Sequence, residues 1–124
     1  IIAMTELGNF KLLFLFLLLW FLSSKKRNCK IILKFSSLAV LVELLKIFLK
    51  RSRPFGEGFA YPSGHASLSF FLYLWFYNQY KNEKFAKIFL FLALFIPLTR
   101  VLLGAHWFSD VIGGILLALI FLNL

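Results

Sequence analysis

The chain has 124 residues, of which 61% are hydrophobic, 17 are phenylalanine and only five are acidic. Apolar runs of this length and number are not typical of a soluble domain of this size, so we expect an integral membrane protein. The formal net charge of +9 does not indicate a nucleic-acid partner, because basic residues in such a hydrophobic chain more simply mark its membrane topology.

Five stretches are candidate helices on the scale of a bilayer, whose hydrocarbon core of about 30 Å takes about 20 helical residues. In chain order they cover residues 7–24, 31–49, 66–80, 85–103 and 107–124. The first is the weakest, because its uninterrupted apolar run covers only residues 12–22. We expect an all-α, polytopic transmembrane bundle with a single domain over residues 1–124. A start at Ile1 rather than Met leaves an additional upstream helix open.

The basic residues predict an orientation. Eight of them gather in the loops after the first and third helices, namely Lys25, Lys26, Arg27, Lys30, Lys34, Lys81, Lys84 and Lys87. By the positive-inside rule this side is cytoplasmic, which places residues 53–63 and 103–107 on the opposite face. Lys50 and Arg51 count against this orientation but are outweighed. The single Cys29 lies on the cytoplasmic side, where an inert thiol is the simplest interpretation.

The loop after the second helix is marked by Pro54 and two glycines. Because proline disfavours helix at the residue before it, the second helix should end near Arg51. Ser63 is a good N-cap for the third helix, which leaves Gly64 and His65 in the first helical turn. The unpaired backbone N–H groups of such a turn attract anions without any basic side chain.

Other glycines and a proline point to packing rather than to chemistry. Gly104 can break the chain between the fourth and fifth helices, and Pro97 is expected to kink the fourth. Gly113 and Gly114 are expected to permit a close helix contact.

His106 and Asp110 are four residues apart, which places both side chains on one face of a helix. The Asp110 carboxylate can then accept the proton of one ring nitrogen and leave a lone pair on the other, which is the pairing of a nucleophile and its orienter. An interfacial histidine satisfied by its neighbour is an equally simple interpretation. Arg100, six residues before His106, shifts the balance, because its planar guanidinium suits a bidentate grip on a phosphoryl group.

Lys46 and Arg53 are seven residues apart and can lie along one helix face, where both reach the same anion. Glu43, three residues before Lys46, is expected to be its ion-pair partner. For Lys50 and Arg51 we favour the interpretation of generic cations near the membrane surface.

His65, His106 and Asp110 together resemble the donors of a metal site. Three cations crowded around a divalent ion would be electrostatically unfavourable, however, so no metal and no cofactor is expected. In the company of these cations His65 becomes a candidate proton donor.

Taken together, these clusters resemble the three motifs of the type 2 phosphatidic acid phosphatase (PAP2) superfamily. In order, they are Lys46-x6-Arg53-Pro54, Pro62-Ser63-Gly64-His65 and Thr99-Arg100-x5-His106-x3-Asp110. The resemblance spans residues 46–110, and it departs from the family in one place, where Thr99 replaces the usual serine. Because a hydroxyl is retained, we expect a tuned site rather than an inactive one.

The resemblance implies a role for each motif residue. It makes His106 the nucleophile that accepts the phosphoryl group, Asp110 its orienter, and His65 the acid that protonates the leaving oxygen and later helps to activate water. The groups that it places on the phosphate oxygens are the side chains of Lys46, Arg53 and Arg100 and the backbone amides of Ser63 and Gly64.

The function implied is metal-independent hydrolysis of a lipid phosphomonoester or diphosphate through a phosphohistidine, with the site on the extracytoplasmic side of a bacterial inner membrane. Substrates known in the family are undecaprenyl diphosphate, phosphatidylglycerol phosphate, phosphatidic acid and lipid A phosphates, and short outer loops favour undecaprenyl diphosphate or lipid A. Membrane lipids are the expected surroundings, and the sequence does not indicate an oligomeric state. The alternatives are a catalytically silent phospholipid-binding or scaffold member and, because the motifs recur there, a vanadium haloperoxidase, whose known examples are soluble.

Overall fold

The computed structural model describes residues 6–24, 29–56 and 58–124. Its helices in chain order are α2 (Phe10–Ser23), α3 (Cys29–Leu49), α4 (Gly64–Gln79), α5 (Ala86–Leu102) and α6 (Phe108–Leu122). Strand pairing in the described ranges is limited to a single isolated bridge between Ser52 and Phe59. The predicted all-α fold with five helices is therefore confirmed.

Within the described ranges, no helix combines the length and the apolar character that a membrane crossing requires. The five predicted segments are thus confirmed as helices, and none of them is confirmed as a membrane span. Of the predicted cytoplasmic cluster, Lys25, Lys26 and Arg27 lie outside the described residues.

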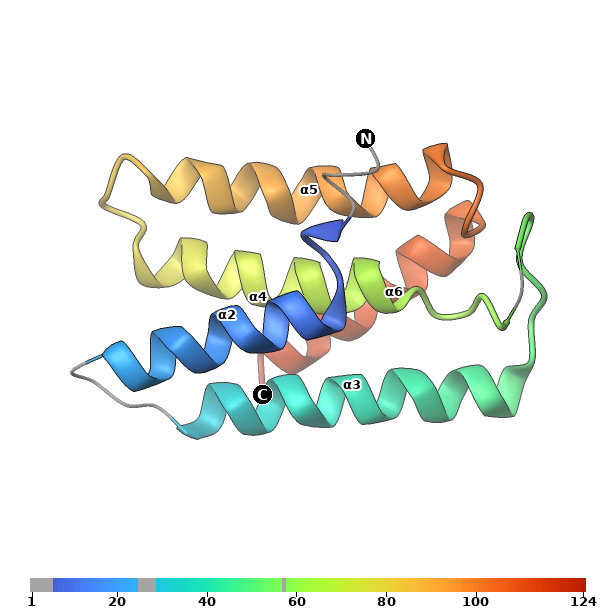
Figure 1. The fold of residues 1–124 in the computed structure, drawn as a ribbon, viewed down its shortest axis with the longest axis horizontal. Coiled ribbons are helices and arrows are strands. Elements are labelled where there is room, and N and C mark those ends of the chain that lie inside the picture. The colour runs from blue at the N-terminus through green and yellow to red at the C-terminus, as the bar shows by residue number, and fades with distance from the viewer. Residues whose placement is uncertain (1–5, 25–28, 57) are drawn as a thin grey trace.

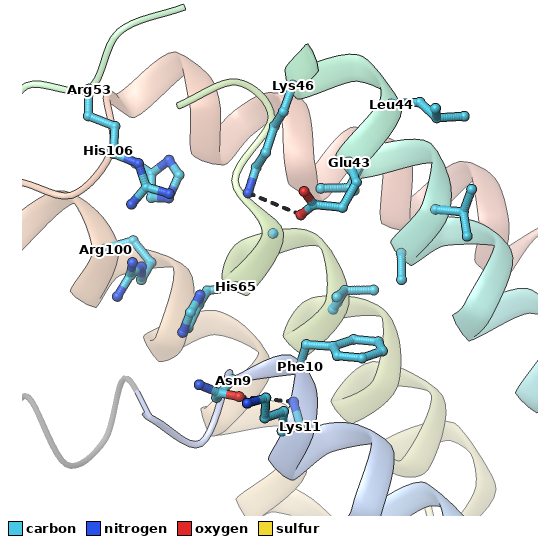
Figure 2. Close-up of a pocket in the computed structure, with 15 residues that line it drawn as sticks. Asn9, Phe10, Lys11, Glu43, Leu44, Lys46, Arg53, His65, Arg100 and His106 are labelled. Carbon is cyan, nitrogen blue, oxygen red and sulfur yellow. Dashed lines mark hydrogen bonds and ion pairs between the residues drawn. The ribbon is translucent and has the colours of Figure 1, made fainter. Parts of the chain in front are cut away.

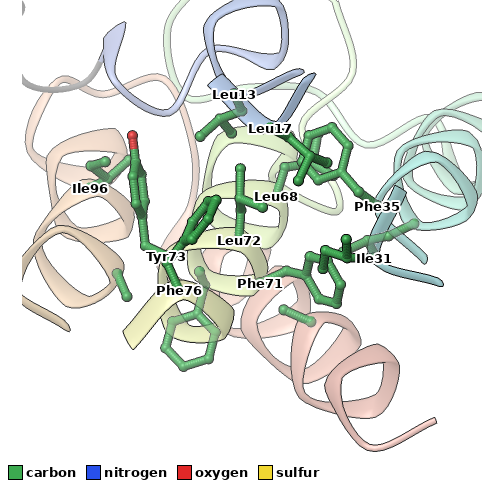
Figure 3. Close-up of a cluster of buried hydrophobic side chains, with 14 of the residues drawn as sticks. Leu13, Leu17, Ile31, Phe35, Leu68, Phe71, Leu72, Tyr73, Phe76 and Ile96 are labelled. Carbon is green, nitrogen blue, oxygen red and sulfur yellow. The ribbon is translucent and has the colours of Figure 1, made fainter. Parts of the chain in front are cut away.

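Helix α4 lies at the centre of the bundle and contacts the other four helices (Figure 1). Its apolar side chains meet residues of α2 and α3 in the core drawn in Figure 3, where Phe71 and Leu72 of α4 lie close to Leu17 of α2 and Phe35 of α3. All four are fully buried. Truncating a buried phenylalanine such as Phe71 to alanine costs about 3–5 kcal/mol, so this core holds α4 firmly in place.

Helices α4 and α6 approach closely because α6 carries two adjacent glycines. A Cβ on Gly114 would lie 2.8 Å from the carbonyl oxygen of Ser63, and one on Gly113 would lie 2.5 Å from the ring of Tyr61. The predicted close helix contact is confirmed for Gly114, whereas Gly113 packs against Tyr61 in the loop before α4. The contact brings the start of α6 to the start of α4, where the Ser63 N–H donates to the carbonyl of Asp110 at 3.1 Å.

The helix ends follow the local sequence signals. Helix α3 ends at Leu49, close to the predicted end, and Lys50 takes a left-handed conformation with φ of 52°. Ser63 is the N-cap of α4, and its side chain accepts the N–H of Ala66 at 3.2 Å. Gly104 has φ of +72° in the turn between α5 and α6, a conformation that favours glycine, so the predicted break is confirmed.

The α3–α4 loop and the α5–α6 turn lie at the same end of the bundle (Figure 1). Hydrogen bonds tie them together: the N–H of Phe55 donates to the Gly104 carbonyl at 3.1 Å, and Nε1 of Trp107 donates to the Ser52 carbonyl at 2.9 Å. These contacts bring the predicted site segments, which are far apart in sequence, to one place.

Candidate active site

A pocket of about 700 Å³ lies at this end of the bundle, between α2, α3, α4 and α5 (Figure 2). The predicted site residues that line it are Lys46, Arg53, Gly64, His65, Arg100 and His106. Ser63 and Asp110 are fully buried behind it. The structure therefore brings all three sequence clusters together.

His106 follows α5 in the turn that leads to α6, and only 2% of its surface is exposed. Its Nδ1 lies 2.8 Å from the carbonyl oxygen of Ala60. Because a carbonyl oxygen can only accept, Nδ1 must carry the hydrogen, and a neutral ring then has its lone pair on Nε2. Nε2 is thus the nitrogen available for nucleophilic attack.

The partner that sets this tautomer differs from the one predicted. The nearest carboxylate oxygen of Asp110 is 3.8 Å from Nδ1 of His106, too far for a hydrogen bond. That oxygen, Oδ2, instead accepts the backbone N–H of Trp107 at 2.7 Å and caps the start of α6. The expected direct hydrogen bond between Asp110 and His106 is therefore wrong for this structure, and the Asp110 carboxylate lies beside the ring without bonding to it.

The surroundings of His106 keep its ring neutral. Burial, the largest cause, and the charges of Arg53, Arg100 and Lys46 together lower the pKa of this imidazole from 6.5 to about 3, against the opposing effect of the hydrogen bond to Ala60. A neutral ring at physiological pH is the form that a nucleophile needs.

Three cations reach the pocket from three separate segments. Lys46 comes from the last turn of α3, Arg53 from the loop and Arg100 from the last turn of α5. Lys46 forms the predicted ion pair with Glu43, at 3.6 Å, and its Nζ would lie 3.4 Å from a Cβ on Gly64. Lys46 is therefore next to the start of α4, beside the predicted anion site.

Arg53 is held by the loop that carries it. Its Nε donates to the carbonyl of Phe59 at 3.3 Å, which closes the loop across the Ser52–Phe59 bridge. The remaining guanidinium N–H groups of an arginine in this position can serve a bidentate grip on an anion.

Both hydrogen-bonding groups of Ser63, a predicted phosphate ligand, have partners within the protein. Its N–H is bound to the carbonyl of Asp110, and its hydroxyl caps the N–H of Ala66, so neither group is free for phosphate. The backbone N–H groups of Gly64 and His65 belong to the first turn of α4, where no intrahelical carbonyl is within reach. Gly64 lines the pocket, so its amide is the better candidate.

His65 lines the same pocket from the first turn of α4. Its Nε2 is buried and has no hydrogen-bond partner among the described residues. Burying a polar nitrogen without a partner is costly, so this atom is expected to find its partner in a bound ligand.

Thr99, which replaces the serine of the family motif, does not line the pocket. It is fully buried, and its hydroxyl donates to the carbonyl of Ile96 within α5. A tuning effect of Thr99 on the site stays a prediction.

Sequence reasoning missed several residues at the site. Asn9 and Lys11, at the start of α2, line the end of the pocket beyond His65 in Figure 2. Arg51 lies 3.3 Å from Oδ1 of Asp110. Ala60 contributes only a backbone carbonyl, which no sequence pattern reveals.

The comparison with protein families agrees with the motifs. The family model described as "PAP2 superfamily" matches residues 27–124, which include all three motif segments. The chain belongs to the PAP2 superfamily. A search of curated proteins finds no match. In the described part of this PAP2 chain, no group of three or more His, Cys, Asp or Glu side chains is placed to hold a metal ion.

A solved PAP2 structure has the same fold. The crystal structure of a transmembrane PAP2 type phosphatidylglycerolphosphate phosphatase from Bacillus subtilis is 25% identical to this chain, with a TM-score of 0.78. The match covers 98% of this chain and 70% of that one. The likeness therefore extends over the whole bundle and not only over the motifs.

Proposed function

We propose that the protein is a metal-independent PAP2 lipid phosphatase that works through a phosphohistidine on His106. The observation that carries the proposal is the convergence of Lys46, Arg53 and Arg100, from three separate segments, on one pocket with a buried histidine whose Nδ1 is already engaged. Phosphoryl transfer needs mainly positioning and charge stabilisation, and such an arrangement supplies both.

The reaction has two steps. Nε2 of His106 attacks phosphorus, the bond from phosphorus to the leaving oxygen breaks, and His65 gives its proton to that oxygen. A bound phosphate dianion favours the protonated form of His65 beforehand. Water then attacks the phosphohistidine while His65 takes up a water proton, the N–P bond breaks, and inorganic phosphate leaves. The three cations and the Gly64 amide stabilise the charge on the equatorial oxygens in both steps.

The rest of the pocket supports a lipid substrate. Beyond the polar end it is lined by apolar side chains of α2, α3 and α4, among them Phe10, Val40 and Leu68. An acyl or prenyl chain can lie along this wall while its head group meets the cations. Large apolar side chains are also exposed on the outer helix faces, such as Phe48 at 83% and Leu33 at 68%, which supports a location in the membrane.

The substrate is proposed from the same features. Lys11 adds a further cation beyond His65, on the side where the leaving group would lie. This position favours a leaving group that is itself anionic, as in undecaprenyl diphosphate or phosphatidylglycerol phosphate, over phosphatidic acid or a lipid A monophosphate. We place the enzyme in a bacterial inner membrane with the pocket on the extracytoplasmic side.

A panel of lipid phosphates tests the proposal. The purified protein, in detergent with excess chelator, is expected to release phosphate from the two substrates with anionic leaving groups faster than from phosphatidic acid. Lys11→Gln should reduce this preference, with Lys34→Gln as a control that lies outside the pocket. Absence of phosphate release from every lipid would refute the enzymatic function, and activity that requires an added divalent cation would refute its metal independence.

A further inference from the structure

We propose that Arg51 is a positioning residue for the nucleophile, although it lies outside the pocket. Two groups lie beside Nδ1 of His106, the Asp110 carboxylate and the Ala60 carbonyl. The side chain of Arg51 contacts the first, and its backbone carbonyl binds the peptide unit of the second. The inference rests on the proposed function, because it assigns Arg51 a part in the same reaction.

The side chain of Arg51 fastens the first turn of α6. Its Nη1 donates to Oγ of Ser109 at 2.7 Å and lies 3.3 Å from Oδ1 of Asp110, and its guanidinium stands 5.9 Å from the ring centre of Trp107. Asp110 is fully buried and its Oδ1 makes no hydrogen bond within the described residues, so Arg51 provides the cation beside this oxygen. Breaking an ion pair of this kind leaves a buried charge uncompensated.

The backbone of Arg51 reaches the other side of the same ring. Its carbonyl accepts the N–H of Ala60 at 2.7 Å, and the Ala60 carbonyl in turn accepts Nδ1–H of His106 at 2.8 Å. Arg51 therefore contacts both the Ala60 peptide unit, whose carbonyl fixes the tautomer of His106, and the Asp110 carboxylate, which lies beside the His106 ring.

Arginine suits this role better than lysine. A guanidinium can bond Ser109, face Asp110 and stack near Trp107 at the same time, whereas an ammonium is a single point of charge. The Arg51 side chain is 43% exposed, so solvent screens its attraction to Asp110. The combined geometry of its contacts with Ser109, Asp110 and Trp107 therefore matters more than the ion pair with Asp110 alone.

The expected effect is on turnover and not on binding. Arg51 does not line the pocket, so its loss should leave the KM of a lipid phosphate unchanged within about twofold. A misplaced nucleophile lowers the rate of phosphoryl transfer, and a shift on the order of 1 Å costs up to about 100-fold. Arg51→Gln should lower kcat by about 10- to 100-fold, and Arg51→Lys by less. The control is Lys50→Gln, which removes the neighbouring exposed cation and should leave both constants unchanged.

Histidine NMR provides a readout that does not depend on activity. In protein labelled with ¹⁵N-histidine, the Nδ1–H of His106 should exchange slowly in the wild type and in Lys50→Gln, and it should exchange rapidly in Arg51→Gln. Should Arg51→Gln fail to fold, Arg51→Lys decides, with a reduced kcat at unchanged KM as the expected result.

The inference is overturned if Arg51→Gln matches Lys50→Gln in kcat and in Nδ1–H exchange, or if it raises KM while kcat stays unchanged. Failure of the proposed function can be told apart from failure of this inference. If the wild type releases no phosphate, the exchange of Nδ1–H of His106 in Arg51→Gln still tests the role of Arg51.

Discussion

At the scale of single residues, the proposed chemistry depends on a neutral imidazole at His106 in a strongly positive pocket. Burial and three cations hold its pKa at about 3, well below the ordinary 6.5. Between pH 3 and pH 6.5, the His106 ring therefore binds a proton more readily in the unfolded chain than in the folded one. The stability that His106 contributes is therefore fully present above pH 6.5 and is lost as the pH falls towards 3.

This shift can be measured directly because the chain has only two histidines. In His65→Asn, the remaining ring signals belong to His106, and they are expected to stay constant from pH 8 down to about pH 4.5. NMR of the labelled variant in detergent provides the measurement. A titration with its midpoint near 6.5 would show that the ring is not shielded from protonation.

Lys46 and Glu43 should behave differently although they form an ion pair. Lys46 lines the pocket beside Gly64, so Lys46→Gln is expected to lower kcat/KM by about 10- to 100-fold, in line with the roughly 1.5–3 kcal/mol of a hydrogen bond to a charged group. The Glu43 side chain is 69% exposed, and Glu43→Gln is expected to change kcat/KM by less than about threefold. Equal losses in the two variants would mean that Lys46 acts through the pair and not on the substrate.

The candidate residues were predictable where a side chain carries the chemistry. His65, Arg100 and His106 stand out in an apolar chain because ionisable groups are costly there. The hydrogen bond from His106 to Ala60 was not predictable, because every residue has a backbone carbonyl and only the fold selects one. Arg51 resembled any other cation near a helix end until the structure placed it beside Asp110.

At the scale of elements, the contact between α4 and α6 sets the geometry of the site. A Cβ at position 114 would lie 2.8 Å from the backbone oxygen of Ser63, which cannot move without shifting the start of α4. Gly114→Ala should therefore separate the two helices and weaken the bond from the Ser63 N–H to the Asp110 carbonyl.

We expect Gly114→Ala to destabilise the protein by about 1–3 kcal/mol, the usual cost of overpacking. Thermal unfolding in detergent checks the stability, and phosphate release should fall with it. Leu116→Ala is the matched control on the exposed face of α6, with an expected change within about 0.5 kcal/mol. A Gly114→Ala protein as stable and active as the wild type would show that the close contact is not required.

Element ends were predicted where a residue has a strong local preference. Ser63 begins α4 and Gly104 breaks the chain after α5, as expected from capping and from left-handed backbone geometry. Lys50 was not predicted as the first residue beyond α3, since a left-handed backbone conformation is uncommon for lysine.

At the scale of the whole molecule, the two loops that carry the motifs share one end of the bundle, and helix α3, whose first residue is Cys29, begins towards the other (Figure 1). Because successive helices run in opposite directions, the order of the helices alone predicts that these two loops share one end of the bundle. The sideways packing was not, because apolar helices of similar composition offer several faces to one another.

Labelling with a membrane-impermeant maleimide tests the proposed orientation. Cys29 is exposed and is the single cysteine of the chain. It should be labelled only after the cells are permeabilised. In Cys29→Ser/Phe55→Cys, the new thiol at a position that is 76% exposed beside the motif loops should be labelled in intact cells. The reverse pattern would place the pocket on the cytoplasmic side.

The proposed role of His106 as carrier of the phosphoryl group can be tested by trapping the phosphorylated intermediate. The protein is mixed with a lipid phosphate in excess chelator, quenched at alkaline pH, digested and mapped by mass spectrometry. We expect acid-labile phosphate on the peptide that contains His106, and none in His106→Ala. Phosphate on another residue, or turnover by His106→Ala at the wild-type rate, would contradict this role.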